Sequence, residues 1–385
     1  MEKEIVTIII TGFNASKYLA DCFASLYQQT YDNFEIIYVD NASTDNAVDL
    51  IKNKFPKTKI IKLDKNYGYA KACNVGAGNA KGEYLVFINT DMKFDRDWLK
   101  NLLFTLINNE GNGVATVTSK ILDIKTKEAS LISFTVPFNF QTVILNDQPD
   151  KNFPEISFPH GGSMIIKKEL FFDIGAFDEI YFMYHEDFDL GWRLNLFGYK
   201  NIIDLQSICY HEGQETTRKI FNREEILFLT LKNSIFTVIK NYDDDNLRKY
   251  LPWILTSAYL RLEKGIELFD FDFKPKIKGL FFRLDRLIGE IPKPRFVKET
   301  YKACLRRNNK KNEECSFDNL IKKLEDNLPD IKNKRREVQK RRKIQDEKLF
   351  NKFCVFPKNI DQKNIFLMEK HWKNDYSNLL SKLEL

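Results

Sequence analysis

The stretch IVTIIITGFNASKYLADCFASLYQQTYDNFEIIYVD, from Ile5 to Asp40, decides the fold class. It opens with a continuous apolar run, passes through the turn residues Gly12 and Asn14, and then repeats apolar residues at helical spacing over 18–29. A second apolar run follows at 34–39. Strands that are apolar on both faces and alternate with helices indicate a parallel sheet that is covered by helices on both sides.

The alternation continues along the chain after Asp40. After 111 the pattern loosens, and 134–159 is expected to be a long loop with one weak strand. The further elements that the pattern predicts are a helix over 41–55 capped near Ser43 or Thr44, strands at 59–63 and 83–88, a helix over 69–81, a strand at 161–166, a helix over 188–198 and a strand at 200–211. Ligands of such sheets lie at the carboxyl ends of the strands. Asn14, Asp40 and Asp91 fall at these ends.

The second half of the chain has a different composition. From Asn222 to Cys304 it reads as helices rich in aromatic residues, and beyond Arg306 it becomes strongly basic, most of all over 332–343. The last residues, 371–385, place Trp372, Tyr376, Leu379 and Leu383 on one helical face. We therefore expect three parts: an α/β domain over 1–240, a helical segment over 241–307 packed on it, and a charged helical tail over 308–385.

The composition bounds the class of protein. With 385 residues, 43% hydrophobic and 14% aromatic, the chain has ample material for a core, so global disorder is excluded. The net charge of +6 permits anionic partners. The six cysteines are scattered without zinc spacing, the N-terminus has no signal-peptide pattern, and the apolar run 226–240 is too short and too polar to span a bilayer. These features predict a cytoplasmic protein with free thiols.

Several residues are candidates for chemistry, each beside a plainer structural interpretation. Asp40 can accept a hydrogen bond from a ribose hydroxyl or from the imide N–H of uracil or thymine, or it can cap the next helix, which is the interpretation we favour for Asp45. In the glycine-spaced segment 66–82, backbone N–H groups can approach and bind phosphates, or the glycines can permit close packing of the helix on the sheet. Asp91 can hold a divalent cation or cap a loop.

The segment FMYHEDFDLGWRLNLFGYK, 182–200, concentrates acids among aromatic residues. Leu190, Leu194 and Phe197 form an apolar stripe on which Asp187 lies one turn earlier, so a helix begins near Asp187 with at least one acid turned inward. The helix dipole accounts for one acid there, but burying several charges costs free energy unless they are paired or used. A functional carboxylate is therefore plausible, and His211 at the end of the next strand could supply an imidazole to a metal.

Six motifs occur in a fixed order: VDNASTD (39–45), NYGYAKACNVG (66–76), NTD (89–91), HGGSMII (160–166), GAFDEIYFMYHEDFDLGWR (175–193) and CYHEG (209–213). In this order they resemble the family 2 glycosyltransferases of the GT-A fold, most closely their rhamnosyltransferase-like branch. The resemblance covers about the first 240 residues and continues more faintly to Arg307. It implies a mostly parallel central sheet between helices with a C-terminal helical extension, and a catalytic domain over 1–240.

The resemblance also implies roles for individual residues. Asp187 would be the general base of an inverting transfer. To this we add our own hypothesis that Glu186 fixes the acceptor and Asp189 makes structural bonds. Asp91 and His211 would hold Mg²⁺ or Mn²⁺. The nucleotide would contact Thr11, Phe13, Asn14, Asp40, Asn66, Gly68, Lys71, Asn89 and Thr90, and the sugar or acceptor pocket would include Gly161, Gly162 and Trp192. Many members carry Asp where this chain has Asn89, which leaves the metal stoichiometry open.

The expected partners are a UDP- or dTDP-linked sugar such as dTDP-rhamnose and a glycan or lipid-linked glycan acceptor. The basic tail either docks on anionic lipid at the cytoplasmic face of the membrane or packs within and between subunits. Nucleic acid is not expected, because aromatics do not interleave with the basic run. Two other classes stay open: an inactive member that serves as a nucleotide-sugar-binding or scaffold protein, and a nucleotide-dependent oxidoreductase, disfavoured because TGFNASKY lacks the glycine fingerprint.

Overall fold

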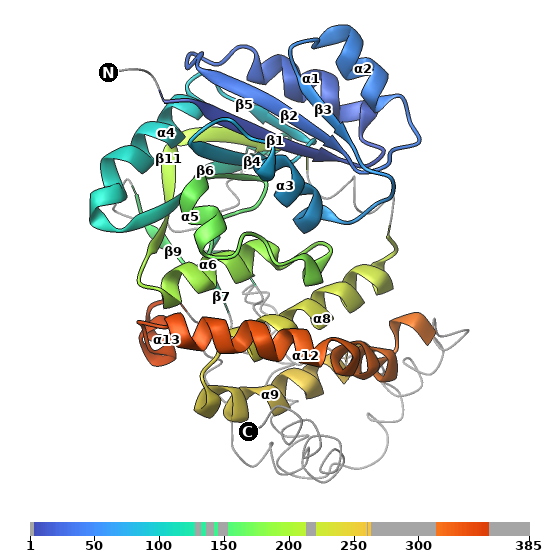
Figure 1. Cartoon of the computed structure of the whole chain (residues 1–385), viewed down its shortest axis with the longest axis vertical. Helices are drawn as coiled ribbons and strands as arrows, with labels where there is room; N and C mark the ends of the chain where they lie inside the picture. Colours follow the sequence, from blue (N-terminus) through green and yellow to red (C-terminus); the bar gives the residue numbers. More distant parts are fainter. Residues whose placement is uncertain are drawn as a thin grey trace. The chain divides into compact units, whose positions relative to one another are not determined.

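A computed structural model describes residues 4–127, 132–135, 142–144, 153–212, 221–259, 261–262 and 313–353. The chain forms two compact units, the first made of 1–222 and 335–355 and the second of 223–334 and 356–385. The expected division into 1–240, 241–307 and 308–385 stays a prediction. Figure 1 labels the elements in chain order.

The first unit follows the predicted alternation of strands and helices. Its first half contains β1 (Val6–Gly12), α1 (Ser16–Leu26), β2 (Phe34–Asp40), α2 (Ala47–Lys54), β3 (Lys59–Lys62), α3 (Tyr69–Gly78), β4 (Tyr84–Ile88), β5 (Met92–Phe94) and α4 (Trp98–Asn109). Its second half contains β6 (Val114–Asp123), β7 (Ile132–Thr135), β8 (Thr142–Ile144), β9 (Glu155–Ile156), β10 (Ser163–Lys167), α5 (Lys168–Asp173), α6 (Glu186–Leu196), β11 (Lys200–His211) and α13 (Asp346–Phe353).

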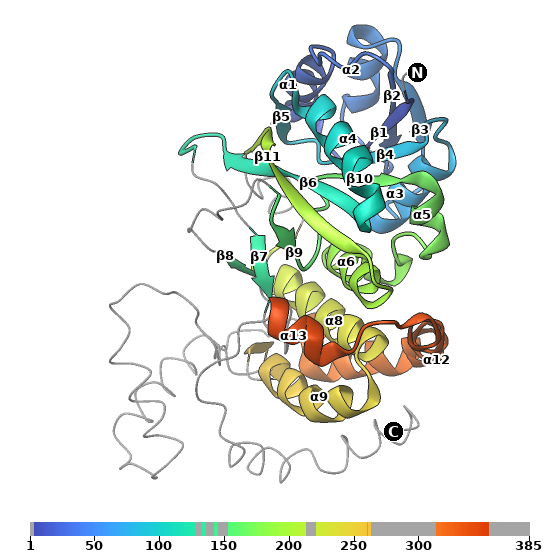
Figure 2. The same cartoon turned by 90° about the vertical axis from the view of Figure 1, so that its left-hand side faces the viewer.

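One mixed sheet organises this unit. Its strand order is β3-β2-β1-β4-β10-β6-β11-β5, with β9 also paired to β11. The strands β3, β2, β1 and β4 are parallel, as are β6 and β11, which Figure 2 shows side by side. The strand β10 runs antiparallel to both of its neighbours, and β5 and β9 run antiparallel to β11. The fold is the expected α/β arrangement with a mostly parallel first half.

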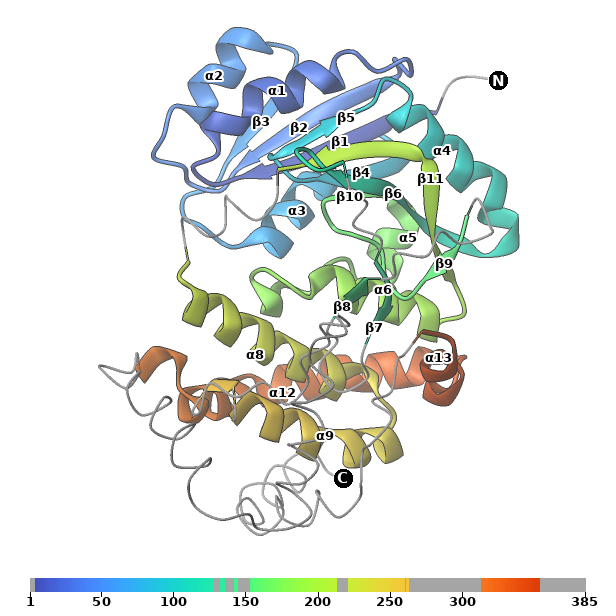
Figure 3. The same ribbon diagram turned by 180° about the vertical axis from the view of Figure 1, so that it is seen from behind.

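The core explains why the strands are apolar on both faces. Val6, Ile8 and Ile10 of β1 belong to one buried cluster with residues of α1 and α4. The intervening Ile9 faces α3, where a Cβ atom on Gly76 would lie 2.6 Å from its side chain. Gly76 therefore allows close packing of helix on sheet, which is one of the two interpretations open from the sequence. Figures 1 and 3 show α1 and α2 on one face of the sheet and α3 on the other.

One helix boundary and one loop differ from the expectation. The helix α2 begins at Ala47 with Asn46 as its N-cap residue, so the expected caps Ser43 and Thr44 lie before it. The Ala47 N–H donates to Asp45 Oδ1 at 3.1 Å in the turn that leads into the helix. The expected loop 134–159 includes a β7–β8 hairpin and the short strand β9. A hairpin there escaped prediction because the pairing of short strands depends on neighbours that the local pattern does not contain.

The second unit contains α8 (Arg223–Asn241), α9 (Asp244–Tyr259) and the greater part of α12 (Phe317–Arg341), whose last residues belong to the first unit. Helices were expected in these regions. None of the helices in the described part of the chain has the length and apolar character needed to cross a bilayer. The amphipathic helix expected over 371–385 and most of the segment 241–307 lie outside the described residues.

Candidate active site

The loops that follow β1, β2 and β4 meet at one edge of the sheet. Gly12 pairs with Asp40, and Ile10 pairs with Ile88, so the carboxyl ends of the three strands are level. Asp40 is buried at the tip of β2 and accepts a hydrogen bond from the Ser43 N–H at 3.4 Å. The residues that the register brings to this edge are Thr11, Phe13, Asn14, Asp40, Asn89 and Thr90.

Asn14 connects two of these loops. It is exposed and has a positive φ of 52°, which asparagine tolerates better than most residues. Its side-chain oxygen accepts from the Thr44 N–H at 2.8 Å, and its own N–H donates to Ser43 Oγ at 3.0 Å. The loop after β1 is therefore bound to the loop that carries Asp40.

Asn41 holds the third loop, and the sequence analysis did not single it out. Its buried amide donates to Asn66 Oδ1 at 2.8 Å and to the Gly68 carbonyl at 3.1 Å. Its side-chain oxygen accepts from the Tyr67 N–H at 2.9 Å. An amide can donate and accept at once, which a carboxylate cannot. The position of Asn41 directly after Asp40 was a signal, but asparagine after a strand is also ordinary turn chemistry.

The loop at Gly68 touches the segment that leads into α6. Gly68 has a φ of +85°, and a Cβ atom there would lie 2.2 Å from the Phe182 carbonyl oxygen. That same carbonyl accepts from the Ala70 N–H at 3.3 Å. Lys71, expected to contact the nucleotide, forms an ion pair with Glu179 at 3.4 Å in this structure.

The segment before α6 is conformationally strained. Phe182, Tyr184 and His185 all have φ between 60° and 71°, a region that L-residues other than asparagine and aspartate rarely adopt. Such backbone persists only when its surroundings hold it, and it gathers at functional sites. The close approach of Gly68 is one of the contacts that hold this segment.

Asp91 and His211 are neighbours because of strand pairing. β5 begins directly after Asp91 and runs antiparallel to β11, with Met92 opposite His211. The distance from His211 Nε2 to Asp91 Oδ2 is 3.3 Å. A carboxylate and an imidazole are ligands that Mn²⁺ accepts in proteins, and Mg²⁺ sites often add substrate phosphates to one or two carboxylates. Among the described residues, no group of three or more potential metal ligands is found, so Asp91 and His211 are a candidate pair of ligands and not a complete metal site.

His160 completes this corner and was also missed from the sequence. Its Nδ1 accepts from the Gly162 N–H at 3.0 Å, and its ring lies edge-on to that of His211 with centroids 6.4 Å apart. Burial lowers the pKa of His160 to about 4, and the nearby His211 adds a smaller effect in the same direction. The ring is therefore neutral with its proton on Nε2, which makes it a hydrogen-bond donor there. Gly162 also packs beside Asn89, whose Nδ2 would lie 2.8 Å from an added Cβ.

Asp187 lies in the first turn of α6. Its Oδ2 accepts from the Gly161 N–H at 2.9 Å and its Oδ1 from the Phe188 N–H at 2.8 Å. Burial raises the pKa of Asp187 to about 6, although both hydrogen bonds act to lower it. The carboxylate is thus held in place and is more basic than an ordinary aspartate.

The inward-facing acids of α6 are Glu186 and Asp189, and Asp187 itself is half-buried. The sequence placed Asp187 on the apolar stripe, but almost every residue of α6 from Asp189 onward is buried, so the stripe does not identify an inner face. Burial, and then the neighbouring Asp187, raises the pKa of Glu186 well above its usual value. Glu186 Oε2 is buried and has no hydrogen-bond partner, which also disfavours the charged form of this side chain.

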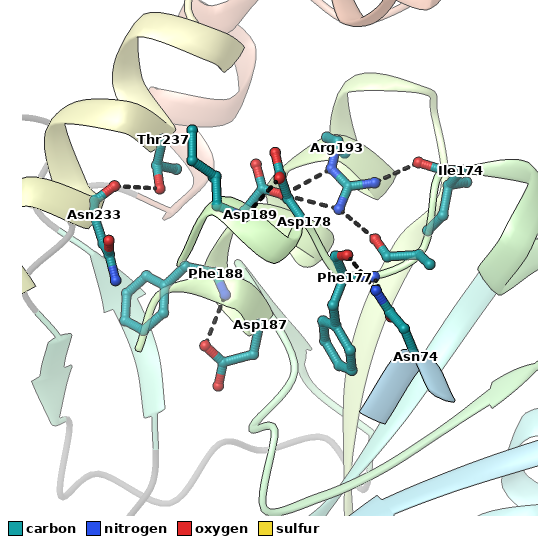
Figure 4. Close-up of polar contacts among 12 residues, drawn as sticks. Asn74, Ile174, Phe177, Asp178, Asp187, Phe188, Asp189, Arg193, Asn233 and Thr237 are labelled. Atoms are coloured by element: carbon teal, nitrogen blue, oxygen red, sulfur yellow. Dashed lines mark hydrogen bonds and ion pairs between the residues drawn. The ribbon is translucent and has the colours of Figure 1, made fainter. Parts of the chain in front are cut away.

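A buried clamp fixes the loop that precedes this site. Arg193 Nε and Nη2 donate to Asp189 Oδ2 at 2.9 and 2.8 Å, and other guanidinium protons go to the Ile174 and Ala176 carbonyls. Asn74 of α3 brackets Phe177, donating to its carbonyl at 2.8 Å and accepting from its N–H at 3.2 Å. Figure 4 shows these contacts converging on the loop. The structural role expected for Asp189 is confirmed.

Trp192 does not lie at an open surface. Its side chain is fully buried and stacks on Phe350 of α13 with ring centroids 6.1 Å apart. This environment supports a packing role and lends no support to Trp192 as a pocket residue. Gly161 and Gly162 belong to the turn that contacts Asp187 and Asn89, so both lie beside the candidate site.

Residues 7–175 match the family model described as glycosyl transferase family 2. These residues carry the sequence pattern of that family. A Haemophilus influenzae protein named as an uncharacterized glycosyltransferase is 24% identical over 316 residues, which are 72% of this chain and 97% of that protein. A second one from the same organism is 35% identical over 144 residues, which are 33% of this chain and 58% of its own length. These matches show that the chain is an enzyme of the glycosyltransferase class.

The crystal structure of GalNAc-T7 with UDP, GalNAc and Mn²⁺ is similar to this glycosyltransferase with a TM-score of 0.53 and 16% identity. The alignment covers 75% of this chain and 57% of that one. At this level of identity the likeness concerns the fold alone. The GT-A fold expected from the motifs is confirmed.

Proposed function

We propose that this glycosyltransferase moves a sugar, with inversion, from a UDP- or dTDP-linked donor to a hydroxyl group of a glycan or lipid-linked glycan used in surface polysaccharide synthesis. A rhamnosyl group is one candidate sugar. The observation that carries the proposal is the turn 160–162. Its Gly161 N–H holds Asp187, while Gly162 packs beside Asn89 at the strand edge near Asp91. A basic carboxylate and a candidate metal pair therefore border one turn.

The proposed reaction needs one carboxylate on the acceptor side. The acceptor oxygen forms a bond to the anomeric carbon while the bond from that carbon to the diphosphate oxygen breaks, and the diphosphate leaves with the electron pair. The hydroxyl proton passes to Asp187. A pKa of about 6 leaves Asp187 deprotonated at neutral pH and still more basic than a free aspartate. Attack opposite the leaving group inverts the anomeric centre without a covalent enzyme intermediate.

The donor side is assembled from the strand-end loops. Asp40 would accept from the base or ribose, and the loop 66–68, held by Asn41, would offer backbone N–H groups to the phosphates. Asp91 and His211 would hold Mg²⁺ or Mn²⁺, which when bound neutralises charge on the leaving diphosphate. Asn89 supplies a neutral amide at the position where many family members carry Asp, whose carboxylate would add a negative charge to the donor side.

Asp187→Asn tests the proposal. The assay measures nucleoside diphosphate released from UDP-glucose, UDP-N-acetylglucosamine and dTDP-rhamnose with Mn²⁺. We expect release to fall by about 10²–10⁴-fold, because an amide cannot take the proton, while calorimetric binding of the nucleotide stays unchanged. Asp245→Asn is the matched control, since Asp245 is exposed and pairs with Arg248 at 3.5 Å within α9 of the second unit. Near-normal release by Asp187→Asn would remove the proposed base.

Asn89 favours a second candidate, an inactive member of the fold that binds nucleotide sugars, because an amide weakens metal affinity. The two functions separate in the same experiment. Nucleotide binding with no release from any of the three donors by the wild-type protein would support the inactive member.

A lipid-linked acceptor would place the protein against the cytoplasmic face of a membrane. Lys340, Lys343 and Lys348 are exposed on and after α12 and would contact anionic lipid there. Replacing the three by Gln should reduce co-sedimentation with phosphatidylglycerol vesicles. Equal co-sedimentation of both proteins would remove this part of the proposal and favour the packing role of the tail.

A further inference from the structure

We propose that Tyr69 is a positioning residue that couples the donor-side loop to the general base Asp187 through Gly161. The inference rests on the role proposed for Asp187. Tyr69 is the first residue of α3 and follows Gly68 directly. Its hydroxyl donates to the Gly161 carbonyl at 2.7 Å, and the Gly161 N–H donates to Asp187 Oδ2 at 2.9 Å. Two hydrogen bonds thus connect the start of α3 to the start of α6 across one glycine.

The turn that carries this link has little room to move. The Gly162 N–H donates to His160 Nδ1 at 3.0 Å, and the Ser163 N–H donates to the His160 carbonyl at 3.0 Å. A Cβ atom on Gly161 would lie 3.2 Å from Asp187 Oδ2, closer than an ordinary contact. The Asn89 N–H also reaches this turn from the donor side, donating to the Gly162 carbonyl at 3.3 Å, but the group that bonds the Gly161 carbonyl is the Tyr69 hydroxyl. Its loss would free the Gly161 peptide by the few tenths of an ångström that separate a good hydrogen bond from a weak one.

The link has a measurable electrostatic consequence. The Gly161 hydrogen bond stabilises the charged form of Asp187 and so lowers its pKa, against burial, which raises it. If the Tyr69 hydroxyl holds Gly161, then its removal should weaken this hydrogen bond and raise the pKa of Asp187 further. A change that only lowered overall stability would leave this pKa where it is.

The other titratable groups near this link do not obscure the readout. Burial raises the pKa of Tyr69 and of Cys73, the next residues along this face of α3, so both are neutral at pH 7. Burial and Asp187 raise the pKa of Glu186 on α6, which disfavours the charged form of Glu186. His160 in the turn is neutral. Replacing Tyr69 by Phe therefore changes no charge around Asp187.

The test is a pH titration of the aspartate side chains by ¹³C NMR, using full-length protein labelled at the aspartate carboxyl carbons. Asp187→Asn identifies the resonance. We expect a midpoint near the pKa of about 6 in the wild type, and a rise of about half to one unit in Tyr69→Phe. Tyr27→Phe is the matched control, because it also loses one hydroxyl hydrogen bond, to Thr58, at a distant place. A midpoint in Tyr69→Phe equal to the wild type would overturn the inference.

A second variant and a rate measurement separate this inference from the proposed function. Gly161→Ala should raise the same midpoint, because its methyl group displaces Asp187 from the N–H. In the diphosphate-release assay, Tyr69→Phe should lower kcat at pH 6 with donor KM unchanged, and recover as the pH rises. Full release by Asp187→Asn would refute the base itself. Loss of release in Asp187→Asn together with an unmoved midpoint in both other variants would refute only the role of Tyr69.

Discussion

Replacing Arg193 by Met should destabilise the first unit by about 3–5 kcal/mol. The substitution keeps most of the aliphatic volume and removes the guanidinium. Asp189, which is fully buried, would then hold an uncompensated charge. The carbonyls of Ile174 and Ala176 would lose their charged donors as well. The buried ion dominates this cost, since a domain has only about 5–15 kcal/mol of total stability.

Urea unfolding followed by circular dichroism measures the effect. With a slope of about 3 kcal/mol per molar urea, a loss of about 3 kcal/mol moves the midpoint by about 1 M. Arg341→Met is the control, because Arg341 pairs with Asp173 at 2.6 Å while 37% and 58% of the two side chains are exposed. An exposed pair of this kind contributes less than about 1 kcal/mol.

The double variant Asp189→Leu/Arg193→Met sharpens the reasoning. It removes both buried charges, so its stability should exceed that of Arg193→Met alone. A loss below about 1 kcal/mol in Arg193→Met, or a double variant less stable than the single one, would refute the view that an unpaired Asp189 causes the damage.

Three further predictions concern the site. Gly68→Ala should destabilise the protein by about 1–2 kcal/mol and weaken UDP binding in calorimetry, since φ is +85° and the methyl group meets Phe182. Gly78→Ala at the other end of α3 is the control, because Gly78 has open space around it and the change should not destabilise. Burial lowers the pKa of His185 to about 3, so the stability that neutral His185 contributes above pH 6.5 is lost as the pH falls. In His185→Asn, the melting temperature should therefore fall less steeply as the pH is lowered. A nucleotide-dependent melting shift should require Mn²⁺ or Mg²⁺ and vanish in Asp91→Asn; a full shift with chelator present would contradict the metal site.

The strands and their polar ends were predictable because the signals are local. A continuous apolar run such as 34–39 predicts a short strand that is buried on both faces, and the next few residues predict the turn that follows it. The parallel register then brings Asp40 level with Gly12 whatever the loops contain. The strand 200–211 and its final His211 were expected on the same grounds, and β11 has these bounds.

The orientation of the acids in α6 was harder to predict. A helical stripe tells which face is inward only when the other face meets water, and α6 is buried on nearly all sides. Asp189 is inward because Arg193 lies one turn later and reaches it, while Asp187 is held outward by the Gly161 N–H. Trp192 illustrates the same limit, because its partner Phe350 is distant in the chain.

The sequence by itself determined the alternation of strands and helices, the polar residues at the strand tips and the motif order that resembles a glycosyltransferase. All of these depend on neighbours within a few residues or on their order along the chain. Only the tertiary structure decided that Asn41 holds the loop 66–68, that His160 faces His211 and that Tyr69 reaches Asp187 through Gly161. Hydrogen bonds and pKa values depend on distances of a few ångströms between segments that are far apart in the chain, and no local pattern records those distances.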